Sequence, residues 1–182
     1  IFSYLFLFSL MALPSLAFAK EATLVKVDYV NNTYRSELST KIHAAPAVLF
    51  ELLTSYEKLN TFSQTIHKSQ LLANGNLLLD LRVCFAIICF EKKQTLKLTV
   101  NNHTVTARII REQSDFESGW MQWQLVPAKE DGSTLFYFSS EMVPDFWVPP
   151  LIGPLLIRHK LKKEARYSIH QLENLAQTIK NR

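Results

Sequence analysis

Glycine is scarce in this chain of 182 residues. The sequence has four glycines and contains neither a Gly-rich phosphate loop nor a G-x-S-x-G sequence. Such patterns let the backbone approach a phosphate group or expose a nucleophilic serine, so their absence argues against a nucleotide-binding enzyme and an α/β-hydrolase. A paired-carboxylate motif is also missing. No catalytic residue is therefore assigned from motifs.

Metal-ligand patterns and strong charge are lacking too. The five histidines include no H-E-x-x-H pair, and no C-x-x-C sequence accompanies them. The sequence thus predicts neither a metal site nor a cofactor. The formal net charge is +4 and the sequence pI is about 9.1. So small an excess favours contact with anionic surfaces but does not indicate a nucleic-acid partner.

Charge is absent from residues 1–19, which are mostly apolar and end in Ala17-Phe18-Ala19. This is typical of a secretory h-region with an A-x-A cleavage site, so we expect a signal peptide over 1–19 and export, with a bacterial periplasm favoured. The run is shorter than the roughly 20 residues that a spanning helix needs, and Pro14 interrupts it. Because the chain opens at Ile1 without Met or basic residues, we also expect residues before it.

Residues 20–182 contain no linker, repeat or low-complexity segment. Their number suits one domain whose core is large enough to include a cavity. We expect a single ligand-binding domain over 20–182, acting as a monomer.

The two cysteines, Cys84 and Cys89, lie in an apolar stretch typical of two strands folded back near Ala86 and Ile87. With that turn, Cys84 faces Cys89 at a spacing of about 4.5 Å between Cα atoms, at the short end of disulfide geometry. We expect a disulfide in an oxidising compartment; two buried thiols are the alternative, because this turn lacks Gly or Asn. The same register satisfies two charge pairs. It pairs Arg82 with Glu91, Asp80 with Lys93, and Val83 with Phe90.

Hydrophobic periodicity predicts the other elements. Strands at 22–30 and 34–43 are joined by a turn, and helical spacing follows Pro46, which suits a first helical position. The remaining predictions are a short helical turn to Phe62, strands near 65–72, 77–85, 88–100, 105–110, 120–126 and 134–142, and a helix over about 151–180 with the apolar stripe Leu161, Ala165, Ile169, Leu172 and Ala176.

This order of elements, together with Ile42-His43-Ala44-Ala45-Pro46-Ala47-Val48 and the short helix that follows to Glu57, resembles the START-like helix-grip superfamily (SRPBCC). Within it, the closest likeness is to the coenzyme Q-binding, polyketide cyclase/dehydrase and lipid-transport family. The resemblance implies an α+β fold, with two short helices after the second strand. A curved antiparallel sheet would wrap around the long C-terminal helix and hold a hydrophobic ligand against it. It does not imply one ligand or one reaction.

Candidate cavity residues lie on the late strands and the hairpin. Aromatic residues are frequent on 120–126 and 134–142, whose two faces are both partly apolar. The apolar face of the hairpin also carries Lys92 and Gln94, which would meet a ligand head group or water. An aromatic-packed core, and a Lys92 whose end reaches solvent, are the alternatives. The candidate ligand-cavity residues are Leu81, Val83, Phe90, Lys92, Gln94, Met121, Trp123, Leu125, Phe136 and Phe138.

A Pro-rich apolar segment over 143–157 precedes a basic helical turn. Its prolines resist helix, so we predict a stiff loop leading into the last helix. An apolar loop beside basic residues can dock on an anionic bilayer and admit a lipid. Alternatively, the loop packs on the sheet and the charges form a solvated face. The candidate mouth or membrane contacts are Phe146, Trp147, Leu151, Ile152, Arg158, Lys160, Lys162 and Lys163.

These patterns favour an exported protein that binds a hydrophobic small molecule, such as a lipid, a fatty acyl chain or a quinone, without catalysing a reaction. Lipid transport is the activity that the resemblance adds. One alternative is a cyclase/dehydrase-type enzyme that uses an ionisable wall residue such as His67, Lys92 or Asp80. Another is an envelope interaction protein whose own side chains fill the cavity.

Overall fold

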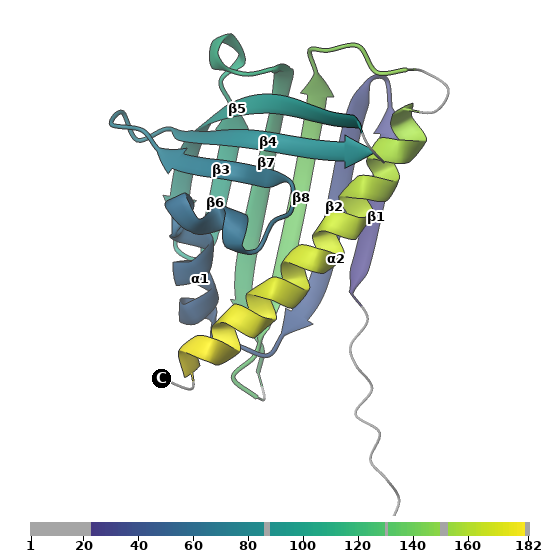
Figure 1. Cartoon of the computed structure of the whole chain (residues 1–182). Coiled ribbons are helices and arrows are strands. Elements are labelled where there is room, and N and C mark those ends of the chain that lie inside the picture. Colours follow the sequence, from purple (N-terminus) through teal and green to yellow (C-terminus); the bar gives the residue numbers. More distant parts are fainter. Residues whose placement is uncertain (1–22, 86–87, 130, 150–152, 181–182) are drawn as a thin grey trace, which may run out of the picture.

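A computed structural model describes residues 23–85, 88–129, 131–149 and 153–180 (Figure 1). The predicted signal peptide over 1–19, the turn residues Ala86 and Ile87, and the candidate membrane contacts Leu151 and Ile152 lie outside the described residues. The elements are β1 (Leu24–Val30), β2 (Thr33–Ile42), α1 (Pro46–Thr54), η1 (Tyr56–Thr61), β3 (Ile66–Leu71), β4 (Leu77–Phe85), β5 (Ile88–Asn101), β6 (Thr104–Ile109), η2 (Arg111–Gln113), β7 (Phe116–Pro127), β8 (Thr134–Pro144) and α2 (Gly153–Lys180).

The strands form one antiparallel sheet in the order β1-β2-β8-β7-β6-β5-β4-β3. Sheet neighbours are also neighbours along the chain except for β2 and β8, which pair from Tyr34 with Met142 to Ile42 with Thr134. β1 and β3 are the two edges, so the sheet stays open. In Figure 1, β3, β4 and β5 run across the view whereas β8, β2 and β1 run along it, which shows how strongly the sheet curves.

α2 crosses the concave side of this sheet and contacts β1, β2 and α1 (Figure 1). The predicted stripe faces inward: Ile169, Leu172 and Ala176 are buried in the core. An apolar stripe at helical spacing is stable only against another apolar surface, and the inner face of the sheet provides one. The predicted arrangement, including the two short helices α1 and η1 after β2, is confirmed.

Two boundaries differ from the predictions. β7 begins at Phe116, not near 120. The pairing of β7 with β8 is irregular between Phe116 and Ser118, and this irregularity interrupts the alternation of apolar and polar residues from which a strand is predicted. A Cβ atom at Gly119 would lie 2.6 Å from the Glu141 carbonyl oxygen, so this close crossing needs glycine.

Pro144 ends β8 and Pro154 lies in the first turn of α2, so part of the predicted Pro-rich loop belongs to these elements. Proline is tolerated there because its missing N–H is not required.

The β4 and β5 hairpin has the predicted register. Cys84 pairs with Cys89 and Arg82 with Glu91. The cysteines form the predicted disulfide, with 4.0 Å between their Cα atoms. The Nε of Arg82 donates to Glu91 Oε1 at 2.9 Å, and this contact lowers the pKa of the Glu91 carboxyl. The link between two neighbouring strands holds their register at the end of the hairpin.

We expect the double variant Cys84→Ser and Cys89→Ser to keep its fold. The bond joins positions five apart, and such a short loop should contribute less than the roughly 3 kcal/mol estimated for a 15-residue loop. Denaturant unfolding measures the difference. Intact-mass analysis of natively purified protein without reductant should also show the loss of two hydrogens, and two freely alkylated thiols would contradict the bond.

Candidate functional site

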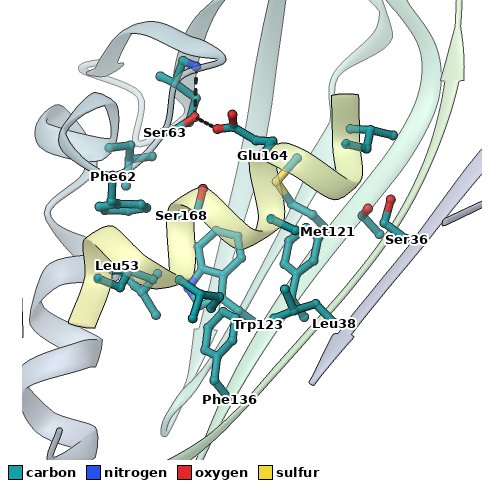
Figure 2. A pocket seen from close by; sticks show the side chains of 18 of the residues that line it. Ser36, Leu38, Leu53, Phe62, Ser63, Met121, Trp123, Phe136, Glu164 and Ser168 are labelled. Carbon is teal, nitrogen blue, oxygen red and sulfur yellow. Dashed lines mark hydrogen bonds between the residues drawn. The ribbon is translucent and has the colours of Figure 1, made fainter. Parts of the chain in front are cut away.

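A cavity of about 230 Å³ lies between α2 and the concave face of the sheet (Figure 2). A single water needs only roughly 10–15 Å³ of such space, so the cavity can hold a larger molecule. Its wall is mostly apolar and includes residues of α1, η1, α2 and seven strands. From the sheet it takes Val25, Val27, Ser36, Glu37, Leu38, Ile66, Leu77, Leu79, Leu96, Met121, Trp123, Phe136, Phe138, Ser140 and Met142; from the helical segments and the loop after η1 it takes Leu53, Leu59, Phe62, Ser63, Leu161, Glu164, Ala165, Ser168, Ile169 and Leu172.

The late strands supply the aromatic part of the wall. On β7 and β8, cross-strand register sets Trp123 opposite Phe138 and Met121 opposite Ser140, so these side chains share one face. Side chains of directly opposed residues in an antiparallel pair point the same way. Figure 2 shows Trp123 and Phe136 below α2, facing the helix.

Only some of the predicted cavity residues line the cavity. Met121, Trp123, Phe136 and Phe138 line the cavity. Leu125 is buried in the core beside them, and Leu81 packs against that core. The other four candidates, Val83, Phe90, Lys92 and Gln94, are not among the described lining residues. Val83 is half-buried, and 51% of the surface of Phe90 is exposed.

The hairpin contributes through its far end. Leu77, Leu79 and Leu96, remote from the cysteine turn, line the cavity. Gln94 is buried behind this wall, where its Nε2 donates to Met142 Sδ at 3.3 Å. Leu77, Leu79 and Leu96 of the predicted hairpin face thus lie inward, whereas Phe90 on the same face is largely exposed.

Lys92 lies over an aromatic ring. Its Nζ is 4.5 Å from the centroid of the Phe146 ring, which packs edge-on against Phe116 at 5.6 Å between centroids. An ammonium over a ring face is attracted by the ring quadrupole. Lys92 thus binds the segment after β8 to the hairpin.

Glu164 is the main polar residue of the wall. Its Oε1 accepts hydrogen bonds from Ser63 Oγ at 2.5 Å and from the backbone N–H groups of Gln64 at 3.0 Å and Thr65 at 3.3 Å. Ser63 Oγ in turn accepts from the Ile66 N–H at 3.0 Å. These bonds tie the loop between η1 and β3 to the middle of α2, and Figure 2 shows the one between Ser63 and Glu164 as a dashed line.

Three polar atoms of lining residues are buried and have no hydrogen-bond partner in the described part of the chain. They are Glu164 Oε2, Ser36 Oγ and Trp123 Nε1. Nearly all buried polar groups in proteins are paired, so each unpaired one calls for an explanation such as a bound molecule. The lining residues therefore include an unpaired carboxylate oxygen on α2, an unpaired hydroxyl on β2 and an unpaired indole N–H on β7.

The sequence pattern of the last helix could have identified some of the polar lining residues. Glu164 stands three positions after the stripe residue Leu161, and Ser168 stands three positions after Ala165 and four before Leu172. Both therefore fall within the apolar face of the last helix. A carboxylate on a buried stripe is rare unless it is paired. Ser63 and Ser36 had no comparable signal, because their positions depend on contacts far along the chain.

The residues predicted to form the cavity mouth or a membrane contact differ in how far they are exposed. Phe146 packs inward, whereas Trp147 is 79% exposed and Leu155, in the first turn of α2, is 63% exposed. Arg158 is tied to the sheet, because its Nε donates to the Val27 carbonyl oxygen at 3.0 Å. Of the predicted lysines, Lys163 is exposed; Lys160 and Lys162 are half-buried.

No protein-family model matches the sequence, and a comparison with curated proteins finds no relative. Solved structures do match. A START superfamily protein from Mycobacterium smegmatis has a TM-score of 0.63 at 16% identity, covering 80% of this chain and 98% of that chain. A STAR-related lipid transfer protein from Xanthomonas axonopodis has a TM-score of 0.60 at 12% identity, covering 85% and 99%. The chain has the START-like helix-grip fold.

The START-like fold does not by itself select a function. The Zhui aromatase/cyclase from Streptomyces sp. R1128 matches with a TM-score of 0.53 at 13% identity, over 79% of this chain and 91% of that chain. One fold can thus carry a lipid transfer protein and a cyclase, and function must be argued from the site.

Filling the cavity should abolish apolar binding. We expect Ala165→Phe to fold and to lose binding of an environment-sensitive apolar dye, because the ring would occupy space between α2 and the sheet. Arg166→Phe, at the neighbouring exposed position, is the matched control and should bind the dye like the wild type. Equal dye binding by both variants would show that the dye does not use this cavity.

Breaking the bond between the η1–β3 loop and α2 should destabilise the protein. Ser63→Ala removes a hydrogen bond to the Glu164 carboxylate, and we expect the free energy of unfolding to fall by about 1–3 kcal/mol. Thr61→Ala lacks only an exposed bond to the Lys58 carbonyl and should stay within about 0.5 kcal/mol of the wild type. Denaturant unfolding of both variants measures this difference, and equal values would refute the contribution of Ser63.

Proposed function

We propose that this chain is an exported protein that binds a hydrophobic small molecule, a lipid, fatty acyl chain or quinone, between the sheet and α2, and that it transports lipid. The observation that carries the proposal is the apolar cavity between these two layers. Pockets for small molecules are concave and mostly apolar and contain a few placed polar groups, which is the composition of this wall. A cavity of about 230 Å³ also argues against the alternative in which the protein's own side chains fill the space.

Export is supported by two features. Residues 1–19 have the composition of a signal peptide, and the Cys84 to Cys89 disulfide suits an oxidising compartment such as the periplasm. Within the described ranges, no helix combines the length and the apolar character that a bilayer crossing requires. We infer that the mature chain, residues 20–182, works as a monomer.

Peripheral membrane contact is the proposed route of loading. Trp147, between β8 and α2, is an exposed apolar residue, as are Leu155 and Leu156 in the first turn of α2. Leu155 precedes Leu161, the first lining residue of this helix, by about 9 Å along the helix axis. The lysines at 160, 162 and 163 lie on the same part of the helix and would add attraction to anionic lipid.

A cyclase-type enzyme is the second candidate. The unpaired carboxylate oxygen of Glu164 favours it, because such an oxygen in an apolar wall could accept a proton from a substrate. None of the residues named for this role from the sequence is among the described lining residues: His67 is exposed on β3, Asp80 lies on β4, and Lys92 packs on Phe146.

Native mass spectrometry tests the binding function. The purified mature chain should carry an apolar molecule that organic extraction removes, since the cavity wall is mostly apolar. The Ala165→Phe variant should be purified without it. A wild-type protein that shows only the mass of its own chain, and that takes up no added lipid, would refute the proposal.

Vesicle binding tests the docking surface. Replacing Lys160, Lys162 and Lys163 by Gln should weaken binding to anionic vesicles by about 1 kcal/mol per charge, and high salt should abolish the difference. Trp147→Ser with Leu155→Ser should instead weaken binding even at high salt, because burial of apolar surface is not screened. Phe146→Ser is less informative, since that ring packs inward. Equal vesicle sedimentation by the wild type and both variants would remove the membrane route.

A further inference from the structure

We propose that the cavity selects amphiphiles whose polar end is a hydroxyl group, and that Glu164 Oε2 accepts the hydrogen bond from that hydroxyl. The inference rests on the proposed function, because it names the ligand class of the same cavity. It separates hydroxyl-bearing molecules, such as a fatty alcohol, a sterol-like alcohol or a quinol, from fatty acids and from oxidised quinones.

The position of the carboxylate is fixed by the protein. Three donors from the loop after η1, one hydroxyl and two backbone N–H groups, converge on Oε1. With Oε1 held, the carboxylate cannot turn to exchange its two oxygens without breaking these bonds. Oε2 is buried in a lining residue and has no partner in the described part of the chain. One oxygen is therefore structural, and the other lacks a hydrogen bond that a ligand could supply.

The charge of the wall decides which head group fits. Glu164 and Glu37 are the charged residues among the described lining residues, which include no Lys, Arg or His; Glu37 is exposed, so the charge that faces a ligand would be that of Glu164. A carboxylate or phosphate head group would find no cation and would meet a second negative charge in an apolar surrounding, which is strongly unfavourable. An ionised carboxylate only accepts hydrogen bonds, so an ether, ester or quinone carbonyl offers it nothing. A hydroxyl supplies the missing donor without a charge of its own.

The remaining polar atoms suit a ligand with one small polar end. Ser36 Oγ and Trp123 Nε1 are the other unpaired atoms of the wall, and Trp123 is 7% exposed. A hydroxyl both donates and accepts, so a serine hydroxyl or an indole N–H could complete it where the ligand reaches them. The rest of the wall is hydrocarbon and matches the body of such a molecule.

A matched ligand series tests this assignment. The delipidated mature chain is titrated with decanol, decyl methyl ether, decanoate and decylamine, which share one chain and differ in the head group. We expect decanol to bind about tenfold or more tightly than the ether, as a hydrogen bond to a charged group provides, and decanoate to bind more weakly still. Tighter binding of decylamine than of decanol would overturn the choice of a hydroxyl.

The variant Glu164→Gln tests the role of Oε2. Its amide oxygen can still accept from the Ser63 loop, while its NH₂ group would replace Oε2 as a donor. We expect the difference between decanol and the ether to disappear and decanoate to gain about tenfold or more, since the like charge is gone and a donor is present. Glu173→Gln removes the same charge from α2 outside the described lining and should leave all ratios unchanged.

The outcomes separate this inference from the proposed function. Ratios are compared within each variant, so a change of stability alone does not alter them. If the wild type binds all four molecules equally, or if Glu164→Gln keeps the wild-type ratios, Glu164 is only a structural residue and the inference fails while the binding function stands. If none of the four molecules binds, both fail.

Discussion

The packing of one helix against a curved sheet is the constraint on which the rest of this structure depends. The inner face of the sheet carries Leu77, Leu96 and Trp123, which would meet water if α2 were absent. α2 covers this face with an apolar stripe that also contains the short residues Ala165 and Ser168. Short side chains at the centre of the contact leave space between the layers. Closure of the core and formation of the cavity thus have the same cause.

The cavity wall also contains a polar residue with two roles. Glu164 joins α2 to the loop before β3 through Oε1, and its Oε2 is buried without a hydrogen-bond partner in the described part of the chain. A buried carboxylate is costly, and the three donors on one oxygen offset part of that cost. The same bonds that stabilise the loop orient the free oxygen. In the role proposed for Glu164, stability and ligand selection are therefore coupled at one side chain.

Other conspicuous sequence features lie away from this wall. The disulfide stands at the end of the β4 and β5 hairpin, where Phe90 is largely exposed. The segment after β8 is divided between Phe146, which packs on Phe116 beneath Lys92, and Trp147, which faces outward. The disulfide thus fixes the register of the hairpin, Phe146 packs the loop against the sheet, and Trp147 is left on the surface. The cavity itself depends on the opposite half of the hairpin and on the late strands.

Local interactions determined what the sequence alone could predict. The hairpin register followed from the position of one turn and the charge pairs on either side of it, and the stripe of α2 followed from its period, because both depend on residues close along the chain. Trp123 and Phe136, named as cavity candidates because aromatic residues are frequent on the late strands, both line the cavity. Which inward residues reach the cavity was decided only by the tertiary structure: Val83 and Lys92 lie away from it, and Ser36 lines it. The bond from Ser63 to Glu164 spans 101 positions, and no local pattern encodes a contact that the curvature of the whole sheet creates.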